Sequence, residues 1–257
     1  MTAVTAAAEA APRLDMGRVA KTTFATIQSN LPVFGLLSMA LIGIPDALVE
    51  WLVNVTKAAG DSSGSIGFTL LERLLDAVGT VVLTGSAIHI THEHLAGRRA
   101  GVGESLSVGL RNSAKVFGIN VVSGIGAALG LLLFIVPGVI LALRWSMSVP
   151  AGVVEGLGVA QAMDRSVQLT KGNRWAILGL FTALALGFLA VAVLFGFCAG
   201  LVEAIDPGAE AAASAAATGI SDALLTLFLG VGPAVVYAEL RAIREGGATG
   251  VLESVFD

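Results

Sequence analysis

The sequence predicts an all-α membrane protein, a polytopic transmembrane helical bundle with six spans plus interfacial amphipathic helices. Of its 257 residues, 55% are hydrophobic and only 13% are charged, whereas a soluble globular domain carries roughly 25% charged residues. Six apolar runs approach or exceed the roughly 20 residues that a membrane-crossing helix needs. Lysine and arginine also gather in alternate connections between these runs, which is the pattern that orients membrane proteins.

The six apolar runs differ in how strongly they predict a membrane-crossing helix. The second is the least apolar, because Glu72, Arg73 and Asp76 interrupt it. Pro45 lies inside the first and predicts a kink there, and Pro137-Gly138 predicts a tight turn between the third and fourth. The expected spans are Leu31 to about Val55, about Ile66 to Ile90, about Val116 to Ile135, Val139 to about Val154, Trp175 to about Val202, and about Ala215 to Leu240.

The distribution of positive charge predicts which side each connection faces. With six spans, the side that carries both termini holds most of the basic residues: Arg13, Arg18, Lys21, Arg98, Arg99, Arg111, Lys115, Arg165, Lys171, Arg174, Arg241 and Arg244. The opposite side has Lys57 and the acids Asp61, Glu203, Asp206 and Glu210. Because cytoplasmic loops are enriched in lysine and arginine, both termini are expected in the cytoplasm.

The chain divides into a tail and one membrane domain. Residues 1–16 are rich in alanine and threonine and are expected to form a disordered cytoplasmic tail. Residues 17–257 form the membrane domain, in which each hairpin follows an amphipathic segment with near-helical spacing of apolar residues. The amphipathic segments are 17–30, 103–118 and 158–173, and the resulting units of helix plus hairpin are 17–92, 103–156 and 158–240.

Charged side chains inside the expected spans are the first candidate site. Glu72, Arg73 and Asp76 lie in the second span, and Arg144 lies in the fourth at a similar depth. Because a charge at that depth is costly unless it is paired or hydrated, an ion-pair network of Arg144 with Glu72 or Asp76 is one interpretation. A polar cavity or transport path is the alternative, and snorkelling side chains or a shorter second span are a third.

A polar motif at the cytoplasmic edge is the second candidate site. It comprises Glu155, Arg165, Ser166, Thr170, Lys171 and Gly172. Glu155 is expected to pair with a basic residue there, Arg165 or Lys171. A phosphate-binding turn is disfavoured because the GxxxxGK order is missing. A helix end capped at Gly172 is favoured instead, with Lys171 next to anionic lipid.

Other patterns argue against cofactors and catalysis. His89, His92 and Glu93 share one helix face, but HITHEHL is not HExxH and no further ligand is evident. We therefore expect interfacial contacts rather than a metal, and no cofactor. Cys198 lies in an apolar run and is expected to be inert. A basic patch that would bind nucleic acid is not evident.

The stretch PGVILALRWSMSVPAGVVEGLGVAQAMDRSVQLTKGNRW, residues 137–175, resembles a bacterial membrane family. That family is the membrane domain found with glycerophosphoryl diester phosphodiesterases, together with related multi-pass proteins. PAVVYAELRAIREGG, residues 233–247, resembles the closing segment of the same family. The matching residues are Pro137-Gly138, Arg144, Pro150, Glu155-Gly156, Ala162, Arg165-Ser166, Leu169 to Gly172, Trp175, Tyr237, Leu240-Arg241 and Glu245-Gly246.

The resemblance implies a modest role in the bacterial cytoplasmic (inner) membrane. In that family the membrane domain looks like an anchor or accessory part beside a separate phosphodiesterase, and this chain shows no phosphodiesterase domain. We therefore expect a non-enzymatic accessory or scaffold protein whose partners are membrane lipids and either a second copy or another membrane protein. A transporter or lipid-binding protein with a polar site around Arg144 is the alternative, and an intramembrane enzyme is the least favoured reading.

Overall fold

A computed structural model describes residues 14–60 and 62–256 of the chain, and all regular elements in this part are helices. Residues 1–13 of the predicted tail and Asp61 of the first connection lie outside the described residues. The elements are α1 (Met16–Ser29), α2 (Leu31–Ser38), the π-helix η1 (Met39–Gly43), α3 (Ile44–Ala58), α4 (Ser62–Leu95), α5 (Val102–Leu133), α6 (Ile135–Trp145), α7 (Ser148–Val154), α8 (Val159–Thr170), α9 (Arg174–Ile205), the 3₁₀ turn η2 (Pro207–Ala209) and α10 (Glu210–Phe256).

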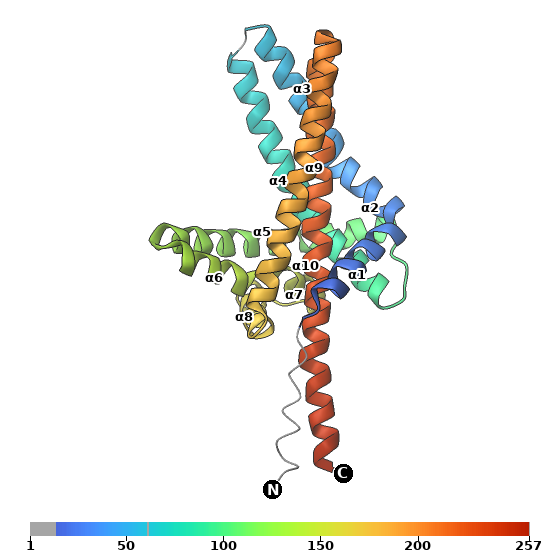
Figure 1. The fold of residues 1–257 in the computed structure, drawn as a ribbon, viewed down its shortest axis with the longest axis vertical. Helices are drawn as coiled ribbons and strands as arrows, with labels where there is room; N and C mark the ends of the chain where they lie inside the picture. The colour runs from blue at the N-terminus through green and yellow to red at the C-terminus, as the bar shows by residue number, and fades with distance from the viewer. Residues whose placement is uncertain (1–13, 61, 257) are drawn as a thin grey trace.

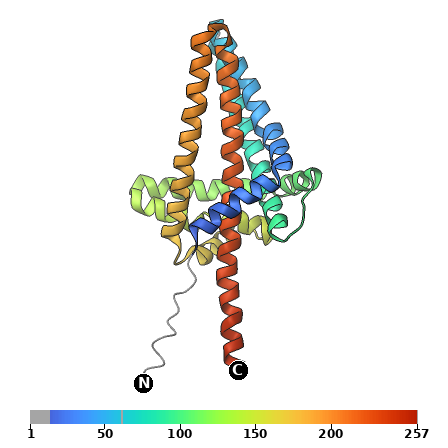
Figure 2. The same ribbon diagram turned by 45° about the vertical axis from the view of Figure 1, so that its right-hand side comes forward.

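Two directions organise these helices. Helices α3, α4, α9 and α10 run along the long axis of the molecule, and α10 continues well beyond the others (Figure 1). Helices α5 and α6 form a hairpin that projects sideways, across that axis (Figures 1 and 2). Helix α1 runs obliquely across the bundle, and α8 lies where α9 begins (Figure 1). The sequence predicts that α5 and α6 cross the membrane beside the other spans, and the structure does not show this parallel arrangement.

Five stretches of the described residues are long and apolar enough to cross a membrane. They are Leu31–Ala58, Val102–Leu133, Ile135–Val154, Arg174–Ile205 and Ala211–Gly246. The expected second span lies within the single long helix α4, which is not among them. Its first half carries Glu72, Arg73 and Asp76, and His89, His92 and His94 lie near its end. The structure thus shows a multi-pass architecture but does not by itself establish six spans.

The first span is distorted next to Pro45, as the sequence predicts. Helix α2 passes into the π-helix η1, in which the N–H of Ile44 reaches the carbonyl of Met39. Pro45 then lies in the first turn of α3, where its missing N–H is tolerated. The wide turn therefore ends three residues before Asp46.

Three predicted boundaries need correction. Segment 103–118 is not a separate interfacial helix, because α5 continues unbroken from Val102 to Leu133. The turn between α5 and α6 lies at Phe134, whose φ of −161° and ψ of 148° are extended, while Pro137-Gly138 fall in the first turn of α6. The expected fourth span is divided at Ser146 and Met147 into α6 and α7. Segments 17–30 and 158–173 do form short amphipathic helices, α1 and α8.

Close backbone contacts hold the bundle together. A methyl group added at Gly219 of α10 would lie 2.2 Å from the carbonyl oxygen of Gly43, and one added at Gly109 of α5 would lie 2.4 Å from that of Val82. Small residues of this kind let membrane helices approach closely, which increases van der Waals packing in lipid. Helices α3, α4 and α10 consequently pack against one another, and α5 crosses α4.

Candidate functional site

Five polar side chains join α8 and the residue after α7 to α10. We call this set the α8–α10 clamp: Glu155, Arg165, Tyr237, Arg241 and Glu245. Arg165 Nε donates to Glu155 Oε1 at 2.8 Å, and its Nη2 donates to Glu245 Oε1 at 2.6 Å. Tyr237 Oη donates to Glu155 Oε1 at 2.5 Å, and Arg241 Nε donates to Glu245 Oε2 at 2.8 Å. The predicted pairing of Glu155 with Arg165 is confirmed.

The clamp connects both stretches that carry the family resemblance. Glu155 and Arg165 come from residues 137–175, whereas Tyr237, Arg241 and Glu245 come from residues 233–247. Burial lowers the pKa of the Arg165 guanidinium, but hydrogen bonds to Glu155 and Glu245 outweigh it and hold that pKa above its usual value. Arg165 therefore stays charged, and each carboxylate of the clamp accepts hydrogen bonds from at least two side chains.

Two further residues of the predicted motif, Ser166 and Thr170, make hydrogen bonds that hold α8 in place. Ser166 is fully buried, accepts a hydrogen bond from the Met147 N–H at 3.0 Å and donates to the Arg144 carbonyl at 2.7 Å. Thr170 Oγ1 donates to the Ser166 carbonyl at 2.9 Å. These hydroxyls are therefore occupied in holding α8 against the break between α6 and α7. They do not form a phosphate-binding pair.

Helix α8 ends at Thr170 with an extended Lys171 at its C-cap, so the cap lies one residue before the predicted Gly172. Gly172 has a φ of +91°, which a glycine adopts without a steric penalty. The Lys171 carbonyl accepts a hydrogen bond from Arg244 Nη2, which adds another link to α10. Asn173 Oδ1 accepts one from the Leu14 N–H at 3.2 Å, so the segment before α1 is attached here as well.

Arg144 does not join the acidic residues of α4. No ion pair links it to Glu72 or Asp76 among the residues that the structure describes, and its helix α6 packs against α5, α8 and α9. Its carbonyl accepts from Ser166, while its Nε is buried without a hydrogen-bond partner. The predicted network of Arg144 with Glu72 or Asp76 is therefore corrected: the sideways course of the hairpin carries α6 away from this part of α4.

The structure instead surrounds Glu72 and Asp76 with acids that the sequence did not single out. Asp46 of α3 and Asp222 of α10 interact electrostatically with both residues and with Arg73. We call Asp46, Glu72, Asp76 and Asp222 the acidic cluster. Asp46 and Glu72 are buried, whereas Arg73 is exposed. Asp222 could have been found from its place in a stripe of polar residues at four-residue spacing along α10: Ser214, Thr218, Asp222 and Thr226.

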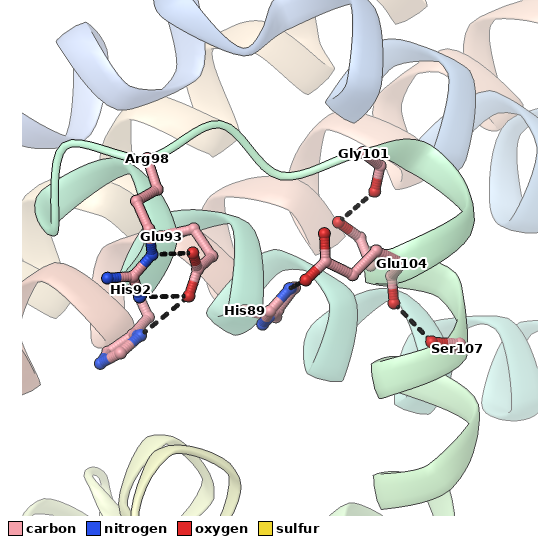
Figure 3. A network of polar contacts seen from close by, with 8 residues as sticks. His89, His92, Glu93, Arg98, Gly101, Glu104 and Ser107 are labelled. Carbon is pink, nitrogen blue, oxygen red and sulfur yellow. Dashed lines mark hydrogen bonds and ion pairs between the residues drawn. The ribbon is translucent and has the colours of Figure 1, made fainter.

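The histidines near the end of α4 face different partners (Figure 3). His89 Nε2 lies 3.4 Å from Glu104 Oε1 of α5, whereas His92 Nδ1 lies 3.6 Å from Glu93 Oε1. Arg98 binds Glu93 with two hydrogen bonds, of 2.5 and 2.8 Å. The described residues include no group of three histidine, cysteine or acidic side chains arranged to hold a metal. These contacts fasten the connection after α4 to α4 itself through Arg98 and Glu93, and they join α4 to α5 through His89 and Glu104.

The clearest cavity is apolar and lies between α1, α9 and α10. It has a volume of about 560 Å³. Phe24 and Phe228, whose ring centroids are 5.9 Å apart, lie along it, and Gly187 of α9 leaves space there, since a methyl group added to it would meet no atom within 4 Å. Acidic-cluster residues do not line this cavity.

Comparison with known proteins agrees with the resemblance predicted from the sequence. Residues 121–229 match the family described as the membrane domain of glycerophosphoryl diester phosphodiesterase. UPF0259 membrane proteins of Yersinia pestis (strain Pestoides F) and of Yersinia pseudotuberculosis (serotype O:3, strain YPIII) are 26% identical over 152 residues, which is 59% of this chain. The match spans 58% of the length of these relatives. No solved structure matches. The chain is thus a multi-pass membrane protein similar to the glycerophosphodiesterase membrane domain and, distantly, to the UPF0259 membrane proteins.

Proposed function

We propose that the chain is a non-enzymatic accessory protein of the bacterial inner membrane, which holds a rigid platform of α8 and α10 at the cytoplasmic surface for a partner membrane protein. The observation that carries this proposal is the hydrogen-bond network of the α8–α10 clamp. Its two carboxylates and two guanidinium groups are bound to one another, and Tyr237 also donates to Glu155. Groups engaged in this way position helices and offer no free nucleophile or base.

The proposal includes an orientation and six membrane segments. Helices α2–α3, α4, α9 and α10 would cross the membrane along the long axis, and the hairpin of α5 and α6 would supply the remaining pair, embedded in lipid. Leu132 and Phe134 at the hairpin tip are 83% and 75% exposed, which favours contact with lipid over contact with water. Four full crossings place both termini on one side, and the excess of lysine and arginine there favours the cytoplasm.

The enzymatic alternative is tested by an assay on purified protein in lipid nanodiscs. Glycerophosphocholine and glycerophosphoethanolamine are supplied with magnesium or calcium, and released glycerol 3-phosphate is measured. We expect release to equal that of empty nanodiscs, because both clamp carboxylates are engaged by arginine or tyrosine side chains. Release that scales with protein concentration and is lost in the Glu155→Gln variant would contradict the proposal and assign the clamp to catalysis.

Lipid binding is the second candidate function, and the cavity between α1, α9 and α10 favours it. The cavity lies along Arg174–Ile205 and Ala211–Gly246, both long and apolar enough to cross a membrane. Its lining is almost entirely apolar, as an acyl chain requires. A bound lipid would fill the gap between the loosely packed α9 and the rest of the bundle.

A further inference from the structure

Three helices bring polar faces together inside the bundle. Helices α3, α4 and α10 pack against one another, and each carries polar residues three or four positions apart, which places them on one helix face. Asn54 Nδ2 donates to Glu50 Oε1 at 3.3 Å and to Ser214 Oγ at 3.0 Å, so α3 and α10 are joined through their polar faces. The stripes are Asp46, Glu50 and Asn54; Glu72, Asp76 and Thr80; and Ser214, Thr218 and Asp222.

Asp46 begins the polar stripe of α3 and has no hydrogen-bond donor among the described residues. Its side chain is 2% exposed, and neither carboxylate oxygen has a hydrogen-bond partner among the described residues. The charged groups that face it are Glu72, Arg73 and Asp76 of α4 and Asp222 of α10. An ionised carboxylate buried in lipid without donors is strongly disfavoured. The surrounding acids increase this effect because they repel an ionised Asp46, and Arg73 opposes them with a positive charge.

We propose that Asp46 is a proton-binding site inside the membrane, completed by Glu72, Asp76 and Asp222. A hydronium ion of the bulk solvent supplies the proton, which adds to one Asp46 oxygen and removes the buried negative charge, leaving water. A proton fits better than a divalent metal, since no three of these side chains converge on a metal position in the part of the chain described. Asp76 is half-buried and accepts a hydrogen bond from Thr80 Oγ1 at 3.2 Å. It is therefore more accessible than Asp46, which is buried and has no such donor.

The polar stripes give the proton a route to this site. From Asp46, the polar face of α3 continues through Glu50 to Asn54, and Ser214 faces Asn54 from α10. These residues lie toward the end of the bundle that carries the α3–α4 and α9–α10 connections (Figure 1). Protonation is therefore expected to respond to the pH on that side. This inference goes beyond the accessory role and does not depend on it.

Infrared difference spectroscopy of the protein in nanodiscs tests the site. A protonated carboxylic acid has a C=O stretching band that shifts in D₂O. We expect such a band in the wild type, decreasing as the pH is raised, and its loss in Asp46→Asn. Glu203→Gln is the matched control, because Glu203 is an exposed acid near the end of α9, and this variant should retain the band.

Labelling aspartate with ¹³C at the side-chain carboxyl provides a second measurement that does not depend on the folding of a variant. The band of the wild-type protein should shift with this label. No protonated band in the wild type, a band that the aspartate label does not shift, or a band that persists in folded Asp46→Asn would each overturn the proposal.

Discussion

Replacing Arg165 with methionine is expected to lower the unfolding temperature by about 5 °C, corresponding to roughly 2 kcal/mol in a chain of this length. The substitution keeps the apolar stem but removes the hydrogen bonds to Glu155 and Glu245, at 2.8 and 2.6 Å. Glu155 would remain largely buried, with Tyr237 as its remaining side-chain donor. The expected loss of stability is smaller than for a fully buried ion pair, because the Arg165 and Glu155 side chains are 24% and 19% exposed. Circular dichroism during heating in nanodiscs measures the change.

A matched control and a double variant separate the clamp from a general loss of charge. Arg99→Met removes an exposed arginine from the connection after α4 and should change the unfolding temperature by less than 1 °C, as is usual for exposed side chains. Arg165→Met combined with Glu155→Gln should cost less than the sum of the two single changes, because the residues are directly coupled. Equal effects of Arg165→Met and Arg99→Met would mean that the clamp contributes nothing measurable.

Replacing Gly187 with tryptophan is expected to reduce the phospholipid that copurifies with the protein by several-fold. Gly187 lines the apolar cavity, and a side chain can enter there because no atom lies within 4 Å of its added methyl position. An indole ring would occupy volume that an acyl chain otherwise fills. Lipid extraction and mass spectrometry, normalised to protein, measure the difference.

Gly196→Trp is the control for this experiment. Gly196 lies on the same helix and is equally unobstructed, but it does not line the cavity. It should leave the lipid content unchanged. Equal lipid content in both variants and the wild type would remove the cavity as a lipid site, while the accessory role would stand on the clamp.

The sequence predicts the elements of this protein better than their arrangement. Long apolar runs identify five of the membrane-crossing candidates, because burial in lipid demands length and hydrophobicity that are local properties of the chain. Amphipathic spacing likewise identifies α1 and α8. The direction of the hairpin from α5 to α6 depends on how Gly109 packs against α4, which is a tertiary contact without a local signal.

In the candidate sites, too, the sequence predicts contacts between residues close in the chain but not contacts between distant helices. Glu155 and Arg165 are ten residues apart, and their pairing follows from opposite charge near one membrane edge. Tyr237 lies 82 residues from Glu155, so its role in the clamp required the fold. Asp46 and Asp222 were missed because the mainly apolar residues beside each give no sign of the acids that face it from other helices. Their significance appears only when α3, α4 and α10 place them beside Glu72 and Asp76.

Site-directed labelling tests the proposed arrangement in the membrane most directly. Single cysteines replace Lys57, Arg98, Phe134, Lys171 or Asp206 in a Cys198→Ala background and are treated with a membrane-impermeant maleimide in intact cells and in permeabilised cells. Lys57→Cys and Asp206→Cys should react in intact cells, and Arg98→Cys and Lys171→Cys only after permeabilisation, while Phe134→Cys should stay protected in both. Reaction of Lys57→Cys and Arg98→Cys from the same side would show that α4 does not cross the membrane, and reaction of Phe134→Cys would show that the hairpin tip is not embedded. Either result would contradict the proposed topology.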